Sequence, residues 1–242
     1  MAEVLAVHLD GMEGSEWLAA LGWVSPYKQD RIRRFANPID AKRCLVGDLL
    51  VRFALGERLA CPTSAIDIDV SDDGKPFVRN ASHGVHFNLS HSGSWIVCAV
   101  DEGPIGVDIE YIRPIAPGVG RWALSLKEYD MLQQKPPEAR TPFFFTLWTL
   151  KESFLKATGT GLGRPLNSFS VLEAEPGHFR VQGETTSPHQ FWTHAFHKEY
   201  KLAACLQGPF AIDGVRLLHW RDLFDFFRLE DIDHGSRSRP RM

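Results

Sequence analysis

One order of patterns occurs twice along this sequence, and this recurrence restricts the fold more than any other feature. A long helical segment, two strands around an acidic turn with glycine, and a final apolar strand return in the same order about 100 residues later. The paired segments are DAKRCLVGDLLVRFAL with TPFFFTLWTLKESFLKAT, IDIDVSDDGKPFV with FSVLEAEPGHFRV, and WIVCAV with YKLAACL. The recurrence predicts an α+β fold of two similar halves, although the identity is weak and chance patterning is the alternative.

The recurrence also sets the expected boundaries. We predict an N-terminal α+β half over 1–103, a C-terminal α+β half over 104–230 and a disordered tail over 231–242. A cleft between two such halves is a favoured place for a ligand.

Two local predictions concern the ends of helices. The helical segment 25–59 is expected to break near Pro38 and to restart with Asp40 as its N-cap. Near the end of the chain, LLHWRDLFDFFRLEDI fits either a strand or a helix with one apolar face.

Composition and charge argue against several classes of protein. The 242 residues carry a net charge of −3, which gives no general reason to expect a nucleic-acid or membrane partner. The N-terminus lacks the regions of a secretory signal, and no apolar run reaches the length of a membrane span. The four cysteines are scattered without a C-x-x-C pair, as in a reducing compartment. We therefore expect a cytoplasmic protein.

A pair of carboxylates stands on the predicted strand IGVDIEYIRP, residues 105–114. Asp108 and Glu110 are two positions apart, so they project from the same face and their like charges are held together. Taken alone, such a pattern more often marks a solvated edge strand than a functional site.

The second long helix, 141–158, is largely apolar, so we expect it to be buried on most sides. It carries three charges, Lys151, Glu152 and Lys156. Glu152 and Lys156 are four residues apart and share a face, which by itself fits a surface ion pair. On a mostly buried helix, charges must be paired or must line a cleft or a metal. With the two strand carboxylates, Glu152 would make the all-oxygen site that Mg²⁺ prefers beside substrate phosphates.

Residues suited to holding phosphate lie in several separate segments, although a basic helical run more often faces water. They are Lys28, Arg31, Arg43, Lys75 and His91, with Ser90 beside the last. The glycine-rich GTGLG after the second helix fits neither a dinucleotide fingerprint nor a P-loop.

The motifs together resemble a known family. GVDIE, then WTLKESFLKATGTGL about forty residues on, with GKPF and FNLSHSGSW upstream, resembles the surfactin-synthetase-activating (Sfp) type of 4′-phosphopantetheinyl transferase. The resemblance implies transfer of the phosphopantetheine arm of coenzyme A to a serine hydroxyl of a carrier protein, with release of 3′,5′-ADP. It also implies a pseudo-twofold pair of α+β halves with the active site at their interface.

The resemblance implies roles for individual residues as well. Mg²⁺ would be held by Asp108, Glu110 and Glu152, and Lys156 would contact the pyrophosphate. A larger set would surround the phosphates and the adenine of coenzyme A. This set comprises Lys28, Arg31, Arg43, Gly74, Lys75, Pro76, Ser90, His91 and Lys156.

Two residues are candidates for the base that takes the serine proton: Glu152, through a water held by the metal, and Glu128 directly, a role that the resemblance implies for it. The sequence departs from some relatives at Cys44, where they carry a hydroxyl residue near the 3′-phosphate. Losing that hydrogen bond would weaken coenzyme A binding by about 1 kcal/mol, unless a neighbouring cation compensates.

Two other functions would use the same features. A Mg²⁺-dependent hydrolase would cleave the coenzyme A pyrophosphate with water in place of serine, and a non-catalytic module would only bind coenzyme A or a carrier protein. The complete set of three carboxylates and Lys156 argues against a module without catalysis.

The family analogy also suggests partners. We expect carrier domains of peptide or polyketide synthetases in antibiotic biosynthesis. They would dock on the mixed apolar and polar segment 111–140, unless its apolar residues pack into the core. We expect a monomer, because an internal twofold removes the need for a dimer.

Overall fold

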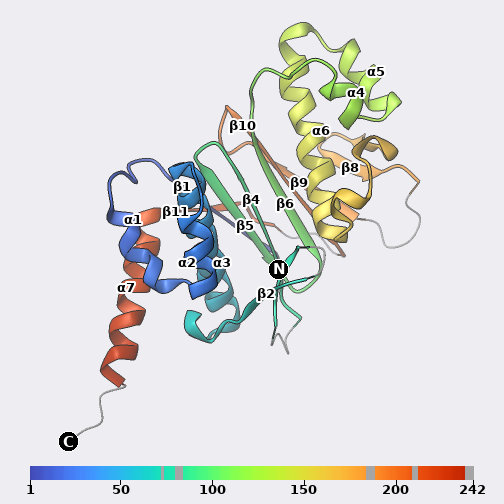
Figure 1. The fold of residues 1–242 in the computed structure, drawn as a ribbon. Helices are drawn as coiled ribbons and strands as arrows, with labels where there is room; N and C mark the ends of the chain where they lie inside the picture. The colour runs from blue at the N-terminus through green and yellow to red at the C-terminus, as the bar shows by residue number, and fades with distance from the viewer. Residues whose placement is uncertain (72–73, 80–83, 184–188, 209–211, 238–242) are drawn as a thin grey trace, which may run out of the picture.

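The computed structural model describes the chain except residues 72–73, 80–83, 184–188, 209–211 and 238–242. Its strands form a sheet in the order β11-β1-β5-β4, a sheet in the order β6-β10-β9, and the two-stranded sheets β2-β3 and β7-β8 (Figure 1). The strands are β1 (Glu3–His8), β2 (Ile68–Val70), β3 (Pro76–Val78), β4 (His86–Ser92), β5 (Trp95–Asp101), β6 (Ile105–Tyr111), β7 (Val171–Glu175), β8 (His178–Val181), β9 (His189–His194), β10 (Tyr200–Gln207) and β11 (Val215–His219). The helices are α1 (Glu16–Ala19), α2 (Pro26–Arg33), α3 (Pro38–Leu59), α4 (Val119–Ala123), α5 (Leu126–Gln134), α6 (Pro137–Thr158) and α7 (Trp220–Arg237), with 3₁₀ turns at Ala20–Trp23, Thr63–Ala65, Gly161–Gly163 and Leu166–Ser168.

The two halves repeat one arrangement. In the first half, α3 accompanies the strands β1-β5-β4 and is followed in the chain by β2 and β3. In the second half, α6 accompanies β6-β10-β9 and is followed by β7 and β8. β1 pairs antiparallel with β5 as β6 pairs antiparallel with β10. The predicted α+β fold of two similar halves is therefore confirmed.

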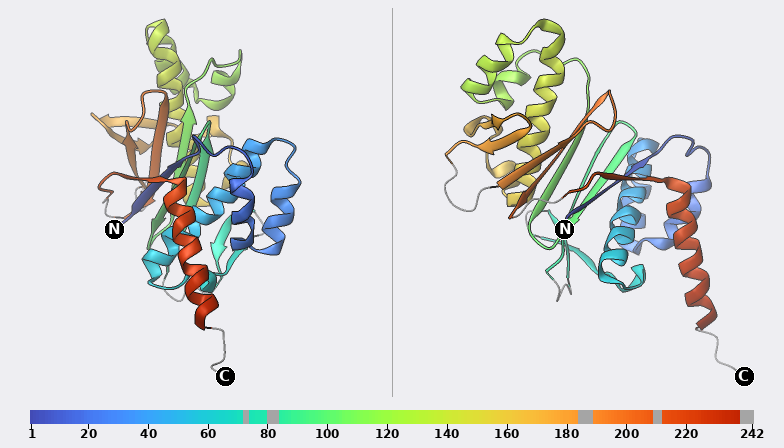
Figure 2. Two further views of the ribbon diagram at one scale, coloured as in Figure 1. Left: turned by 90° about the vertical axis from the view of Figure 1, so that its left-hand side faces the viewer. Right: turned by 180° about the vertical axis from the view of Figure 1, so that it is seen from behind.

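Three apolar clusters hold the layers together. One cluster joins α3 to one face of the first sheet, and a second joins α6 to one face of the second sheet. The third fills the space between the sheets with alternate residues of β1, β5, β6 and β10. Views from opposite sides accordingly show the two long helices on the outside and the strands between them (Figure 2).

The two sheets also meet edge to edge, along β4 and β6. Alternate residues of a strand share one face, and on β4 these are Asn88, Ser90 and Ser92. Their side-chain oxygens accept hydrogen bonds from the backbone N–H groups of Val107, Ile109 and Tyr111 at 2.9, 3.3 and 3.0 Å, respectively. The side-chain oxygens of β4 thus accept the N–H groups of β6, as the backbone carbonyl groups of a neighbouring strand do within a sheet.

The end of the chain differs from the boundaries we expected. The ambiguous segment contains both elements, because β11 pairs parallel with β1 and α7 follows it directly. Both belong with the first half, since Trp220, Leu223 and Phe224 of α7 join the cluster of α3. The expected C-terminal half, 104–230, therefore includes two elements that pack elsewhere. The predicted tail, 231–242, begins inside α7, and residues 238–242 lie outside the described residues.

One predicted helix cap is wrong. The N-cap of α3 is Asn37, whose side chain accepts from the N–H of Ile39, and Pro38 occupies the first turn. Asp40 lies inside that first turn instead, because proline needs no hydrogen-bond acceptor and is favoured at the start of a helix.

No helix in the described part of the chain is long and apolar enough to cross a membrane.

Candidate active site

A glycine brings the second long helix directly onto β6. A Cβ atom on Gly106 would lie 2.1 Å from the carbonyl oxygen of Ser153 and 2.4 Å from the backbone nitrogen of Ala157. Only glycine permits this approach, and it places the polar face of α6 against the carboxylates of β6. Gly106 stands in the GVDIE motif, but its packing role was missed in the sequence because nothing there shows which helix it touches.

Asp108 is the most enclosed carboxylate of the site, with 5% of its surface exposed. Its Oδ1 accepts hydrogen bonds from Ser90 Oγ at 2.9 Å and from Lys156 Nζ at 2.6 Å. Its Oδ2 is buried and has no hydrogen-bond partner among the described residues. Burial raises the pKa of Asp108, and the positive charge of Lys156 opposes that rise.

Glu110 and Glu152 complete a group of three repelling carboxylates. Glu110 Oε2 accepts a 2.7 Å hydrogen bond from Ser92 Oγ. Glu152 makes no hydrogen bond or ion pair with any residue in the described ranges. Burial raises the pKa of both glutamates, and the negative charge of Asp108 raises each further. The predicted neighbourhood of the three carboxylates is thus present in the structure.

As the side chains stand, no group of three or more His, Cys, Asp and Glu residues in the described part of the chain has the spacing of a metal site. Lys156 occupies one oxygen of Asp108, where a cation could otherwise bind. The residues nevertheless fit Mg²⁺, since their donors are all hard oxygens. The unpartnered Oδ2 of Asp108 and the unpaired Glu152 are the groups that a cation would satisfy.

Lys156 lies at the centre of the site. Besides Asp108, its Nζ donates to the carbonyl oxygen of Val107 at 3.0 Å. Lys75 approaches from the other half and donates to the carbonyl oxygen of Lys156 at 2.7 Å. The GKP residues, Gly74, Lys75 and Pro76, therefore lie beside α6, and Lys75 and Pro76 help to line a cavity of about 240 Å³. The predicted contact of Lys156 with a pyrophosphate remains a prediction.

The structure groups the basic residues into two neighbouring sets. Arg43 donates to the carbonyl oxygen of Gly93 at 3.0 Å, in the turn after β4. Burial lowers the pKa of His91, and the nearby positive charges of Arg43 and Lys156 lower it further.

The second set surrounds Cys44. Burial raises the pKa of the Cys44 thiol, while the nearby charges of Lys28 and Arg31 oppose that rise. Lys28 also forms a 3.2 Å ion pair with Asp48. Lys28 and Arg31 therefore lie beside Cys44, the position where the sequence departs from some relatives.

Ser90, which the resemblance includes in the set around coenzyme A, contacts β6 in the structure. It is buried, and its hydroxyl both accepts from Ile109 N and donates to Asp108. A hydroxyl has only one proton to donate, so none remains for a nucleotide.

Glu128 is fully buried and forms an ion pair with Lys151, which is also fully buried. Its other contacts are backbone N–H groups, from Ser125 to Oε2 and from Val171 to Oε1, both at 2.8 Å. Lys151 also donates to the carbonyl oxygen of Phe169 at 2.6 Å. The sequence flagged Lys151 only as a charge needing a partner, and the structure shows that its partner is the glutamate we considered as a base.

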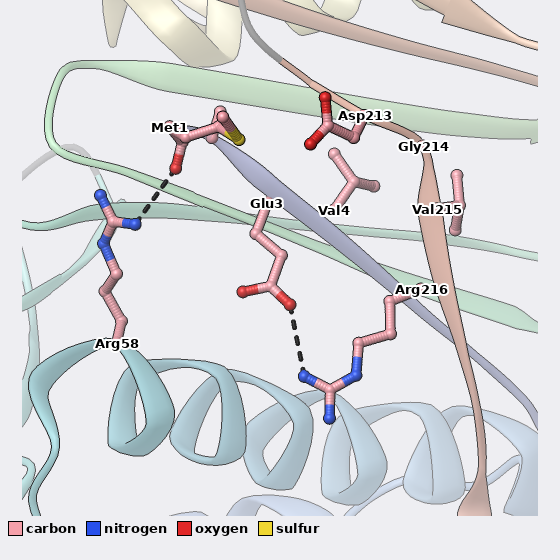
Figure 3. Close-up of a pocket in the computed structure, with 9 residues that line it drawn as sticks. Met1, Glu3, Val4, Arg58, Asp213, Gly214, Val215 and Arg216 are labelled. Carbon is pink, nitrogen blue, oxygen red and sulfur yellow. Dashed lines mark hydrogen bonds and ion pairs between the residues drawn. The ribbon is translucent and has the colours of Figure 1, made fainter.

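A further cavity, of about 450 Å³, lies beside the start of β1 and is lined by Glu3, Arg58 and Arg216 among others (Figure 3). Its cations are already paired, Arg58 with Glu102 and Arg216 with Glu3. None of the predicted site residues lines it.

Comparisons with known proteins find matches over both halves of the chain. Residues 104–205 match the family model "4'-phosphopantetheinyl transferase superfamily", and residues 13–103 match the model "4'-phosphopantetheinyl transferase, N-terminal". A 4'-phosphopantetheinyl transferase of Bacillus subtilis is 40% identical over 83% of this chain and 89% of its own. The 4'-phosphopantetheinyl transferase Sfp of Bacillus subtilis (strain 168) is 35% identical over 84% of this chain and 91% of its own. A third, psf-1 of Bacillus pumilus, is 34% identical over 89% of this chain and 94% of its own.

Proposed function

This chain belongs to the 4′-phosphopantetheinyl transferase superfamily, and we propose that it transfers the phosphopantetheine arm of coenzyme A to a serine hydroxyl of an apo carrier protein, releasing 3′,5′-ADP. The observation that supports this best is the meeting of Asp108, Glu110, Glu152 and Lys156 between β6 and α6. Three acidic oxygen donors beside a lysine suit a pyrophosphate and its divalent cation.

The three carboxylates are the groups that would hold Mg²⁺. When bound, Mg²⁺ would supply positive charge that stabilises the leaving oxygen of 3′,5′-ADP. Lys156 adds a second positive charge on the same oxygens after it leaves Asp108. Once Lys156 turns to the phosphate, Oδ1 of Asp108 loses this hydrogen bond, and Oδ2 has no partner already. A bound cation would satisfy the carboxylate in place of Lys156.

Glu152 is the better candidate for the base. It is half-buried at the site and carries no hydrogen bond or ion pair among the described residues, so it is free to accept a proton. Glu128, by contrast, spends its two oxygens on Lys151 and on two backbone N–H groups inside the core. We therefore assign Glu128 a structural role, as the partner of Lys151 and of these two N–H groups.

The nucleotide of coenzyme A would lie across the first half. Arg43, His91 and Lys156 would face the pyrophosphate, and Lys28 and Arg31 would face the 3′-phosphate beside Cys44. The thiol cannot replace a hydroxyl as a strong hydrogen-bond donor, but the two cations next to it compensate.

The carrier would dock on the segment 111–140. Trp122 and Leu126 are exposed there, at 61% and 85%, whereas Leu124 and Leu132 pack into the core. Some apolar residues of the segment are therefore available to a partner, and others belong to the core. Carrier domains of peptide or polyketide synthetases are the class we propose, and acceptance of only a fatty-acid carrier in a panel of carrier domains would refute it.

Cellular location and assembly follow from the same proposal. No disulfide joins the cysteines in the described part of the structure, which supports a reducing cytoplasm. The internal repeat supports a monomer with both halves of the site in one chain. A sedimentation mass of twice 27.3 kDa would contradict the monomer.

Intact-mass spectrometry of an apo carrier protein, incubated with the chain, coenzyme A and Mg²⁺, tests the proposed function. We expect the carrier to gain the mass of one phosphopantetheine arm, and EDTA to abolish the gain. Consumption of coenzyme A without a gain in carrier mass would indicate the hydrolase instead. Intact coenzyme A across several carriers, despite binding, would indicate a module without catalysis.

A further inference from the structure

A row of polar side chains on β4 contacts both the backbone and the carboxylates of β6. Asn88, Ser90 and Ser92 each accept a hydrogen bond from a backbone N–H of β6. The two serines also donate, Ser90 to Asp108 and Ser92 to Glu110. Each serine therefore contacts one carboxylate and the N–H of the residue that follows it in the chain.

This double contact fixes the direction of each hydroxyl. A serine oxygen that accepts from a backbone N–H keeps one proton, and here that proton points to the carboxylate. Ser92 Oγ lies 2.7 Å from Glu110 Oε2 and 3.0 Å from Tyr111 N, and Ser92 is 7% exposed. The serine end of this hydrogen bond is therefore shielded from water.

The hydroxyls also select which carboxylate oxygens stay free. Ser90 engages Oδ1 of Asp108, and the buried Oδ2 has no partner among the described residues. Ser92 engages Oε2 of Glu110, and within the described ranges no hydrogen bond reaches Oε1. One oxygen of each carboxylate is held and the other is available.

We propose that Ser92 is a positioning residue, which holds Glu110 so that its free oxygen faces the cation, and that Ser90 does the same for Asp108. The inference rests on the proposed function, because it assumes that these carboxylates bind a divalent cation. Residues that orient metal ligands without touching the metal commonly change metal affinity by about 10-fold to 100-fold when they are removed.

Asn88 provides a matched control within the same row. It accepts from the N–H of Val107 at 2.9 Å and is buried to a similar degree, at 8%, but it donates to no carboxylate of β6. Removing either Asn88 or Ser92 leaves one backbone N–H of β6 without its acceptor. Only the removal of Ser92 also releases a carboxylate.

The test is a Mn²⁺ titration of the whole chain, with free Mn²⁺ read by electron paramagnetic resonance, for the wild type, Ser92→Ala and Asn88→Ala. We expect Ser92→Ala to weaken Mn²⁺ binding about 10-fold and Asn88→Ala to leave the dissociation constant unchanged. Both variants should have lower melting temperatures in EDTA. Should Ser92→Ala not fold, Ser92→Cys keeps the volume with a weaker donor and should also weaken Mn²⁺ binding.

Equal Mn²⁺ affinities for the two alanine variants would overturn the positioning role while leaving the metal site intact. Absence of Mn²⁺ binding by the wild type would overturn both this inference and the metal part of the proposed function.

Discussion

The two halves place the same pair of elements in contact, a strand and the long helix beside it, but with opposite chemistry. In the first half, the residues of β1 that face α3 are Leu5 and Val7, both fully buried in an apolar cluster. In the second half, the residues of β6 on the corresponding face are Asp108 and Glu110, with Lys156 of α6 against them.

The difference separates what the fold needs from what the reaction needs. The apolar contact of the first half shows that this arrangement is stable without charges. The charged contact of the second half costs desolvation, as the raised pKa values of its carboxylates indicate. A cation and a phosphate would offset that cost, which is why we place the chemistry in the second half.

The largest expected effect comes from Glu152→Gln. Turnover of coenzyme A and carrier should fall about 10³-fold, equivalent to about 4 kcal/mol, because the variant loses a base and a metal ligand. The melting temperature in EDTA should stay the same or rise, since one of three repelling charges is gone. Carrier modification by mass spectrometry and thermal unfolding measure the two quantities. Equal losses of activity and stability would mean that Glu152 is structural.

The next largest effect is expected for Lys151→Met, which tests whether every charge in the second half serves the reaction. Glu128 would be left as an unpaired buried charge, and stability should fall by about 3–5 kcal/mol in urea unfolding. The double variant with Glu128→Gln should recover part of this loss.

Arg228→Met, in an exposed pair with Asp225, is the matched control and should change stability by less than about 1 kcal/mol. If Glu128→Gln lost turnover at unchanged stability, Glu128 rather than Glu152 would be the base.

Leu5→Ala should show the reverse of Glu152→Gln. Leu5 is 0% exposed in the contact of β1 with α3, so its truncation should cost about 2–5 kcal/mol of stability. The folded fraction should keep its specific activity, because no charge of the second half is touched. Urea unfolding and the mass assay are again the measurements, and a fall in specific activity at full folding would show that the halves are not separable in this way.

The smallest effect is expected for His91, which lies near a charge from each half, Arg43 and Lys156. Its pKa is lowered in the free protein, so it is neutral near pH 7, and a bound phosphate should raise that pKa. Binding then takes up a proton, and the affinity for 3′,5′-ADP should rise as the pH falls from 8 towards 6. Calorimetry of the wild type against His91→Gln measures this. An identical pH dependence in the two proteins would remove His91 from the phosphate site.

The sequence predicted the repeated α+β layout because periodicity and turn residues are local signals. It also predicted a shared site for Asp108, Glu110 and Glu152; in the structure the charges of the first two act on Glu152, but the three are not at metal-site spacing. It did not show that Gly106 admits α6 or that Glu128 pairs with Lys151, because both depend on contacts between distant segments. The packing of α7 on the first half was missed for the same reason.

The hydroxyl row of β4 illustrates a further limit. The alternation of Asn88, Ser90 and Ser92 is visible in FNLSHSG, and it predicts a shared face. It does not reveal the partner strand, because β4 and β6 belong to different sheets and their contact is made by side chains rather than by a backbone ladder.

The central claim is that the charged contact of the second half binds the cation on which transfer depends. A crystal structure with 3′,5′-ADP and Mn²⁺, with the anomalous signal of manganese recorded, tests it most directly. The account predicts one strong anomalous peak among Asp108, Glu110 and Glu152, with Lys156 moved from Asp108 onto the phosphate. A nucleotide bound without a peak there, or with the peak elsewhere, would contradict it.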